Sequence, residues 1–123
     1  MSETVQIKAP WLAFKDPEVP PTLNYSTLSM CGRVEEMVRQ YPNYIAYEFM
    51  GKKTTYAEFM QKIDAAAKAY LALGIQKGDR VTICMPNCPQ AVDSFYALNR
   101  IGAVSNMIHP LSAAGEILSL IHI

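Results

Sequence analysis

Two strand-like segments separated by a helical pattern constrain the fold more than any other feature of this chain. Residues 81–85 are nearly all apolar, and residues 103–109 predict a second strand that Pro110 ends. Between them, residues 91–101 carry apolar side chains at intervals of three and four, the period of an amphipathic helix. The order strand, helix, strand predicts parallel strands joined by a right-handed crossover. We therefore expect the α/β fold class, with strand 81–85 covered on both faces.

A helix over residues 56–73 is expected before the first of these strands. Thr55 and Glu58 have the spacing of a capping box, in which each side chain accepts a hydrogen bond from the other residue's amide. Gly74 supplies the positive φ with which many helices end. The predicted buried face of this helix comprises Phe59, Met60, Ile63, Ala66, Ala67, Tyr70 and Leu71.

The loops around strand 81–85 carry turn and cap signals. Asp79 can accept turn amides beside Gly78, and Arg80 is predicted to be a charge at the strand edge. Asn87 is predicted to cap the following helix, with Gln90 at its third position. The expected buried side of that helix comprises Ala91, Val92, Phe95, Tyr96, Leu98 and Ile101, and Gly102 ends it.

The first half of the chain predicts a helix and a hairpin. Residues 27–40 have helical periodicity, and Tyr41-Pro42 stops it because the residue before proline avoids the helical region. Residues 44–50 predict a strand and residues 51–53 a turn, with Thr54-Thr55 as the returning strand. The strand-like spacing of Tyr44, Tyr47 and Phe49 favours sheet packing over a platform for stacking bases.

The two ends of the chain are expected to differ from its centre. Residues 1–25 hold four of the eight prolines, which predicts an extended arm. Its residues Trp11, Leu12 and Phe14 are expected to pin this arm to an apolar surface. Near the other end, Ser112 could start one more helix.

Composition excludes several classes of protein. Eleven basic residues balance eleven acidic ones, so no electrostatic feature favours nucleic acid. Half of the residues are apolar, which is too many for a disordered chain. No apolar run is long enough for a transmembrane segment, and the start lacks a secretory pattern. Three cysteines, an odd number, fit a reducing compartment and predict a cytoplasmic location.

Few residues are candidates for chemistry. Ligands of parallel sheets bind beyond the carboxyl ends of the strands, here residues 85–87 and 107–110. The loop at 85–89 has no glycine, so its backbone cannot approach a pyrophosphate. Cys84 or Cys88 with His109 would lack a third, orienting group, and neither His109 nor His122 completes a zinc set. We expect His109 to be a strand-end residue with one hydrogen bond, and we assign no catalytic, cofactor-binding or metal-binding residue.

An ordered series of short segments carries a resemblance to a known family. The segments are Thr-Tyr-Ala-Glu at 55–58, Leu-Gly-Ile at 73–75, Lys-Gly-Asp-Arg-Val at 77–81, Met-Pro-Asn-Cys-Pro at 85–89, Gly-Ala-Val at 102–104 and His-Pro-Leu at 109–111. In this order and spacing they resemble the N-terminal region of the adenylate-forming (AMP-binding) superfamily. The resemblance covers residues 26–117, and the sequence Pro-Asn-Cys-Pro at 86–89 is most similar to fatty acyl-CoA synthetases.

The resemblance implies a partial N-terminal lobe of a larger enzyme. Such enzymes activate a carboxylic acid with Mg-ATP to an acyl-adenylate and pass the acyl group to coenzyme A. The family's phosphate loop, adenine motif, ribose-binding aspartate and catalytic lysine have no counterpart in this sequence, so no site residue is carried over. ATP, Mg and coenzyme A are therefore expected for the parent and none for this fragment, whose partner would be the remainder of the synthetase chain.

Three functional hypotheses follow. The first is a fragment of an AMP-forming acid–thiol ligase that is inactive alone, and the second is a noncatalytic interaction module or half of a split enzyme. The third, a small free-standing nucleotide-binding domain, is disfavoured by the missing glycines. The predicted division is an arm at 1–25, the α/β part at 26–117 and an atypical tail at 118–123. The isolated chain is expected to expose apolar surface and an unpaired strand edge.

Overall fold

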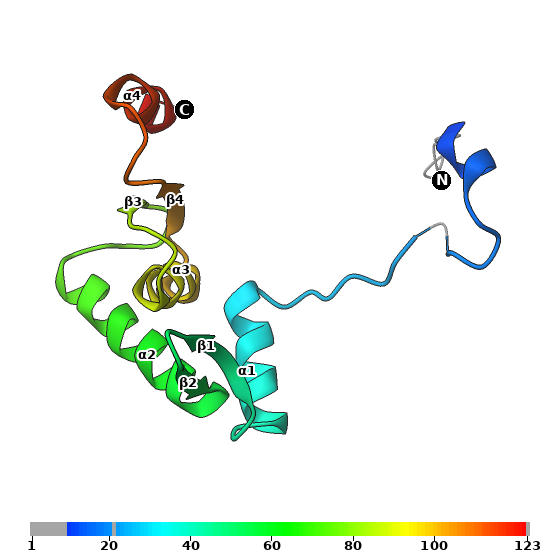
Figure 1. Cartoon of the computed structure of the whole chain (residues 1–123), viewed down its shortest axis with the longest axis horizontal. Coiled ribbons are helices and arrows are strands. Elements are labelled where there is room, and N and C mark those ends of the chain that lie inside the picture. Colours follow the sequence, from blue (N-terminus) through cyan, green and yellow to red (C-terminus); the bar gives the residue numbers. More distant parts are fainter. Residues whose placement is uncertain (1–9, 21, 123) are drawn as a thin grey trace, which may run out of the picture.

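The computed structural model describes residues 10–20 and 22–122 as a helical and sheet body with an arm that leaves it (Figure 1). The elements follow in the order η1 (Pro10–Phe14), α1 (Met30–Gln40), β1 (Ile45–Phe49), β2 (Lys52–Thr55), α2 (Tyr56–Ala72), β3 (Arg80–Cys84), α3 (Pro89–Ile101), β4 (Val104–Ile108) and α4 (Ala114–His122).

Helix α1 starts three residues later than the periodicity predicts. Ser29 is its N-cap, and the Ser29 Oγ accepts a hydrogen bond of 3.0 Å from the Gly32 amide. This bond satisfies an amide that has no partner within the helix, so the helix begins at Met30. Cys31 and Val34 are buried, as the helical spacing predicts.

The hairpin has a tighter turn than expected. Strands β1 and β2 are antiparallel, and Phe49 pairs directly with Lys52. Met50 and Gly51 both have positive φ, 49° and 80°, the geometry of a two-residue turn that matches the twist of a hairpin. The prediction that Lys52 and Lys53 belong to the turn is therefore wrong, because both lie in β2.

Helix α2 confirms the capping box. The Glu58 amide donates to Thr55 Oγ1 at 3.3 Å, and the Thr55 amide donates to Glu58 Oε2 at 2.8 Å. Gly74 follows the helix with φ at 87°. Of the predicted buried face, Phe59, Ile63 and Ala67 are buried, whereas Leu71 is exposed and the prediction for it is wrong.

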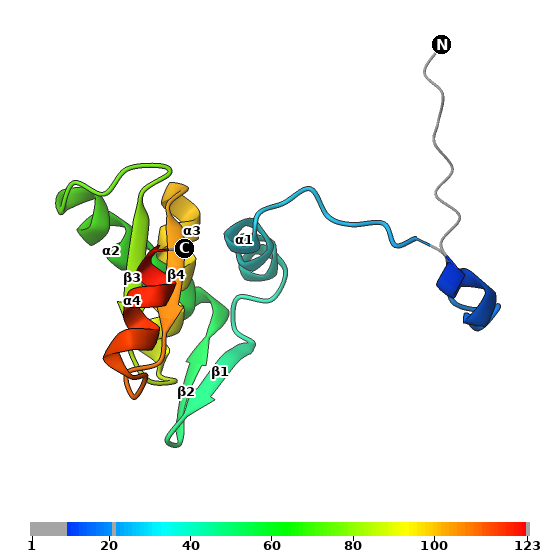
Figure 2. The ribbon, with the colours of Figure 1, turned by 90° about the horizontal axis from the view of Figure 1, so that it is seen from above.

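The predicted parallel pair is present. Strand β3 pairs with β4 in parallel, in register from Arg80 opposite Val104 to Cys84 opposite Ile108. Helix α3 makes the crossover on one face, and α4 lies across the other, so the two strands lie between helices (Figure 2). The helices do not cover the whole strand, however: Ile83 is buried, but Cys84 is exposed. The prediction that strand 81–85 is covered on both faces, which would bury Cys84, is therefore wrong at this residue.

The loop before β3 joins both ends of the crossover. Asp79 Oδ2 accepts from the Gln76 amide at 2.8 Å, which confirms Asp79 as a turn anchor. The Gly78 amide donates to the Gly102 carbonyl at 2.9 Å. Gly102 has φ at 78°, and a Cβ there would lie 2.9 Å from Cγ of Lys77. The end of α3 therefore requires glycine for conformation and for space.

Two apolar clusters form the core. The first packs α1, α2 and α3 together through Cys31, Val34, Phe59, Ile63, Ala67 and Ala97. The second packs α3 against the parallel strands through Ile83, Ala91, Leu98 and Ala103. Tyr70 and Ile101 contact both clusters, so the helices and the sheet form one continuous body.

Several apolar side chains lie outside this core. The arm extends away from the body (Figures 1 and 2), and Trp11, Leu12 and Phe14 are all exposed, so their predicted packing is wrong. Val92 of α3 is exposed too, contrary to expectation.

The part of the predicted arm at residues 1–9 lies outside the described residues. Helix α4 continues through residue 117 to His122 without a break.

The body exposes apolar surface, as predicted. Within the described chain each strand has a single neighbour, because β1 pairs with β2 and β3 pairs with β4. Helix α4 adds the exposed residues Leu118, Leu120 and Ile121. Surfaces of this kind favour association with another polypeptide.

Candidate functional site

An apolar groove of about 900 Å³ lies between α1, the hairpin and the start of α3. It reaches the loop after β3 and, through Met107, the end of β4. This is the edge at which parallel sheets bind ligands. Its lining comprises Met30, Arg33, Val34, Met37, Ala46, Tyr47, Glu48, Phe49, Tyr56, Phe59, Asn87, Cys88, Pro89, Ala91, Val92, Phe95, Tyr96 and Met107.

Aromatic rings build the wall of this groove. Tyr47 packs edge-on against Phe59 with ring centroids 5.4 Å apart, and Phe59 packs in the same way against Tyr96. Phe95 continues the series against Tyr96, again at 5.4 Å. Edge-to-face pairs of this kind stabilise by about 0.5–1.5 kcal/mol beyond their buried area, so the wall has a defined shape.

The groove is poorly suited to a triphosphate. Among its lining residues only Arg33 and Glu48 are charged, and the Arg33 guanidinium already pairs with Glu36. The loop that enters α3 carries Pro89 at the first helical turn, which removes one backbone donor. No group of three metal-ligating side chains occurs within residues 10–20 and 22–122. The residues present therefore do not fit ATP with Mg.

Helix α3 begins one residue later than predicted, with Cys88 rather than Asn87 as its N-cap. Cys88 is the N-cap, its side chain makes no capping hydrogen bond, and Pro89 follows at the start of the helix. Asn87 is exposed and lines the groove together with Cys88. The prediction that Asn87 caps the helix is wrong, because proline fixes the first helical position and the residue before it must stay extended.

His109 and the cysteines form no catalytic pair in the described part of the chain. His109 follows β4, and its Nδ1 accepts from the Leu111 amide at 3.2 Å, as expected of a strand-end residue with one hydrogen bond. Cys84 is exposed, and its strand partner is Ile108 rather than His109. Among the predicted sheet aromatics, Tyr47 packs inward, whereas Tyr44 and Phe49 are exposed.

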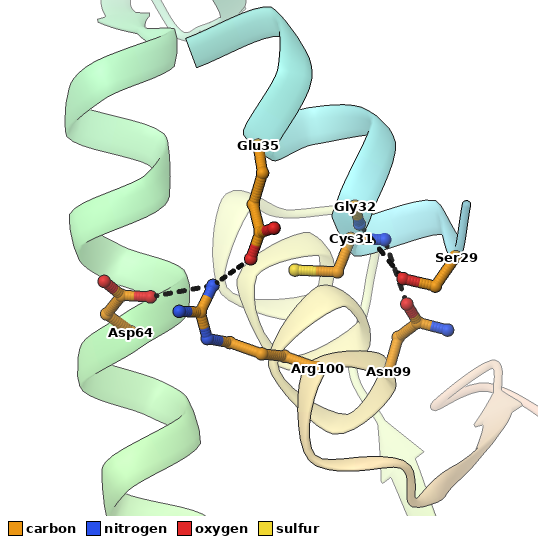
Figure 3. Close-up of polar contacts among 7 residues, drawn as sticks. All are labelled: Ser29, Cys31, Gly32, Glu35, Asp64, Asn99 and Arg100. Atoms are coloured by element: carbon orange, nitrogen blue, oxygen red, sulfur yellow. Dashed lines mark hydrogen bonds and ion pairs between the residues drawn. The ribbon is translucent and has the colours of Figure 1, made fainter. Parts of the chain in front are cut away.

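A polar cluster joins helices α1, α2 and α3 (Figure 3). The Arg100 guanidinium of α3 lies between Glu35 of α1 at 2.7 Å and Asp64 of α2 at 3.3 Å. The neighbouring Asn99 accepts from the Cys31 amide at 2.9 Å, which satisfies one of the free amides at the start of α1. Two adjacent residues of α3, Asn99 and Arg100, therefore hold α1 and α2 in place.

Cys31 lies beside Arg100 at this junction (Figure 3). Burial raises the pKa of the Cys31 thiol, and the hydrogen bond and charge of Arg100 oppose this rise only in part. A buried thiol with a raised pKa is a packing residue rather than a nucleophile. The cluster is structural, and periodicity could not reveal it because Glu35 and Arg100 are 65 residues apart.

No described helix is long and apolar enough to cross a bilayer. The described residues thus form a β–α–β crossover that packs against helices α1 and α2, with an apolar groove and no glycine in the loop at 85–89. This architecture defines a protein of the α/β class, in which helices cover a parallel pair of strands.

Comparison with known proteins gives the family. The sequence model described as AMP-binding enzyme matches residues 34–122, and this chain belongs to that family. A long-chain-fatty-acid–CoA ligase of Bacillus subtilis is 30% identical over 113 residues, covering 92% of this chain and 20% of the relative. An acetyl-coenzyme A synthetase of Dictyostelium discoideum is 37% identical over 75 residues, 61% of this chain and 11% of the relative.

Solved structures give the same fold. The N-terminal domain of FACL13 from Mycobacterium tuberculosis, solved with an inhibitor, superposes with a TM-score of 0.71 at 29% identity. That match covers 76% of this chain and 24% of the other. The expectation of an α/β, N-terminal part of an adenylate-forming enzyme is confirmed. The chain spans a quarter or less of the length of these proteins.

Proposed function

We propose that this chain is the N-terminal scaffold of an ATP-dependent, AMP-forming acid–thiol ligase and is inactive alone. The parent reaction would join a carboxylate to AMP with release of pyrophosphate and then transfer the acyl group to coenzyme A. The family match over residues 34–122, together with the β3–α3–β4 crossover, is the observation that supports this most strongly. The location is proposed to be cytoplasmic.

The nucleotide and coenzyme A would be bound by the remainder of the synthetase chain. The groove offers apolar and aromatic walls, and its loop at 85–89 lacks the glycines that bring backbone amides to phosphate. No step of the reaction is therefore assigned to a residue of this chain. Its contribution is to position the carboxyl ends of β3 and β4.

The groove and the open strands would receive that remainder. An apolar wall of this size, next to strands that have a free edge in the described chain, matches a polypeptide partner that adds strands and apolar side chains. A fatty acid is the proposed substrate class, since the long-chain ligase matches over most of this chain.

A second candidate is a noncatalytic module or one half of a split enzyme. Two connected apolar clusters give the body a core of its own, which an independently folding half requires. Co-expression with a separately encoded remainder would distinguish the two. Activity that appears only when the two chains are mixed favours the split enzyme.

A chimera tests the scaffold role. Residues 34–122 would replace the matching segment of the Bacillus subtilis ligase, and pyrophosphate release and thioester formation would be measured separately with a long-chain fatty acid. We expect both activities in the chimera, none in a deletion of the segment, and background ATP–pyrophosphate exchange by this chain alone. A folded chimera without pyrophosphate release, or real exchange by this chain, would contradict the proposal.

A further inference from the structure

The arm carries an exposed aromatic anchor. Residues Pro10–Phe14 form the 3-10 helix η1, in which Trp11 is 67% exposed and Phe14 is 91% exposed. Side chains three residues apart lie on the same side of such a helix, so the two rings form one apolar surface. Two prolines, Pro17 and Pro20, restrict the backbone after η1, which lowers the entropy that binding would cost. The η1 anchor, defined by Trp11 and Phe14, is therefore preorganised for a pocket.

The groove between α1, the hairpin and α3 is suited to receive such an anchor. Its volume of about 900 Å³ lies within the range of cavities that enclose small organic ligands, so it has room for two rings. Met30, Met37 and Met107 line it beside the aromatic wall, and thioethers adapt to aromatic rings and contact them favourably. Aromatic anchors in desolvated pockets contribute most of the binding energy of many protein interfaces. The exposed anchor and the open groove are therefore complementary.

The exit of the arm from α1 determines which groove the anchor reaches. Ser29 is extended at the N-cap, and the Leu28 amide donates to Ser26 Oγ at 3.2 Å. These local contacts direct the arm outwards, and η1 lies apart from the body in both views (Figures 1 and 2). Residues 15–29 span at most about 50 Å, at about 3.3 Å per residue, whereas a body of about 90 residues is about 30 Å across. The arm is therefore long enough to cross to the body of a second copy.

We propose that this chain forms a symmetric dimer in which the η1 anchor of each copy occupies the groove of the other copy. The inference concerns this chain by itself and does not rest on the proposed function. Lys15 directly follows the anchor, and Glu48, whose side chain is 52% exposed, lines the groove. This pair of opposite charges fixes the orientation of the arm more than it adds affinity. The remainder of a synthetase would compete with the arm for the same groove.

The area of contact favours reciprocal exchange over a single bound arm. An aromatic side chain buries about 150–250 Å², so Trp11 and Phe14 at their present exposure would bury about 300–400 Å² of arm surface. The groove loses a similar area. One bound arm therefore buries about 600–800 Å², which is less than a stable specific interface needs, whereas two arms bury about 1,200–1,600 Å². The symmetric dimer thus reaches the standard interface range.

Trp11 is the only tryptophan of the chain, so its fluorescence reports whether the groove is occupied. A dilution series followed by emission wavelength and by light scattering measures the burial of Trp11 and the mass of the particle together. As the concentration rises, we expect the emission to shift to shorter wavelength in step with a doubling of the mass. An emission that does not change with concentration, or a rise in mass without a shift, would overturn the proposal.

Two variants remove the two sides of the contact separately. Phe14→Asp removes one ring of the anchor, and Val92→Asp places a charge in the groove at a residue that is 41% exposed. Each should weaken dimerisation at least about 30-fold, the effect of losing an interface hot spot. Leu111→Asp is the matched control, because it places the same charge outside the groove at a residue that is 86% exposed, and it should dimerise like the wild type. Dimerisation of Phe14→Asp or Val92→Asp at the wild-type concentration would contradict the exchange.

A mixing experiment distinguishes exchange between copies from closure within one copy. The double variant Trp11→Phe/Phe14→Asp has an intact groove and no tryptophan, so in a mixture with Val92→Asp all tryptophan emission comes from the Val92→Asp arm. We expect this emission to shift to shorter wavelength when the double variant is added in excess, because its free groove accepts the intact arm. A triple variant that also carries Val92→Asp is the control and should give no shift. Emission that stays unchanged with the double variant would rule out exchange between copies.

Discussion

Truncation of Leu98 is the sharpest test of how the sheet is held to the helices. Leu98 is 0% exposed and belongs to the cluster that joins α3 to the parallel strands, where Ile83 is the other large buried side chain. Leu98→Ala removes three carbon atoms, which corresponds to about 2.4 kcal/mol of transfer free energy at about 0.8 kcal/mol each. The cavity left behind adds to this loss.

The neighbours of Leu98 determine the size of that cavity. Ala91 and Ala103 have no side-chain torsion with which to fill the space, so the site can relax little. We therefore expect a loss of about 3–5 kcal/mol in the free energy of unfolding, in the upper part of the range for buried leucines. For a small body this is most of the total stability, so the variant should be largely unfolded at 25 °C.

Urea unfolding followed by circular dichroism at low protein concentration provides the measurement. Leu111→Ala is the matched control, because it removes the same atoms from a side chain that is 86% exposed. The control should lie within about 0.5 kcal/mol of the wild type. Equal midpoints for Leu98→Ala and Leu111→Ala would refute the inferred packing of α3 on the sheet.

Four further predictions concern the cap of α2, the polar cluster and the cysteines. Thr55→Ala should lower the free energy of unfolding by about 1 kcal/mol, which Thr55→Ser should largely retain. The Thr55 hydrogen bonds lower the pKa of Glu58, so the ionised carboxylate should stabilise the folded state fully above the ordinary glutamate pKa. This stabilisation should be lost as the pH falls through the lowered pKa. The pH dependence of the free energy of unfolding should lack this component in Glu58→Gln. Arg100→Ala should lower the free energy of unfolding by about 1 kcal/mol at low salt, because the side chain is only 37% exposed. The loss should be smaller in 0.5 M salt, where charges are screened over about 4–5 Å. A loss that does not change with salt would argue against the ion pairs. Iodoacetamide should modify exposed Cys84 before buried Cys31, and mass spectrometry of early time points should find Cys31 unmodified until urea is added.

Local signals in the sequence predicted the elements that depend on neighbouring residues. The capping box at Thr55 and Glu58 and the positive φ of Gly74 and Gly102 all involve groups within a few residues of one another. The parallel pairing of β3 and β4 followed from the order of the elements, because a crossover helix leaves few other arrangements.

Features that combine distant residues could not be predicted in this way. The groove takes its wall from α1, β1, α2 and α3, and periodicity says nothing about which faces of separate elements meet. The same holds for the cluster of Arg100 with Glu35 and Asp64 (Figure 3). The error at Asn87 had a local signal, since Pro89 favours the first helical position and leaves Cys88 as the cap.

Calorimetric titration of this chain with Mg-ATP tests the central claim most directly. If the chain supplies positioning surfaces and none of the contacts to the triphosphate, the titration should give no saturable heat up to millimolar nucleotide. Saturable binding in the micromolar range would contradict the account, because it would require phosphate-binding groups that the groove lined by residues such as Tyr47 and Tyr96 does not contain.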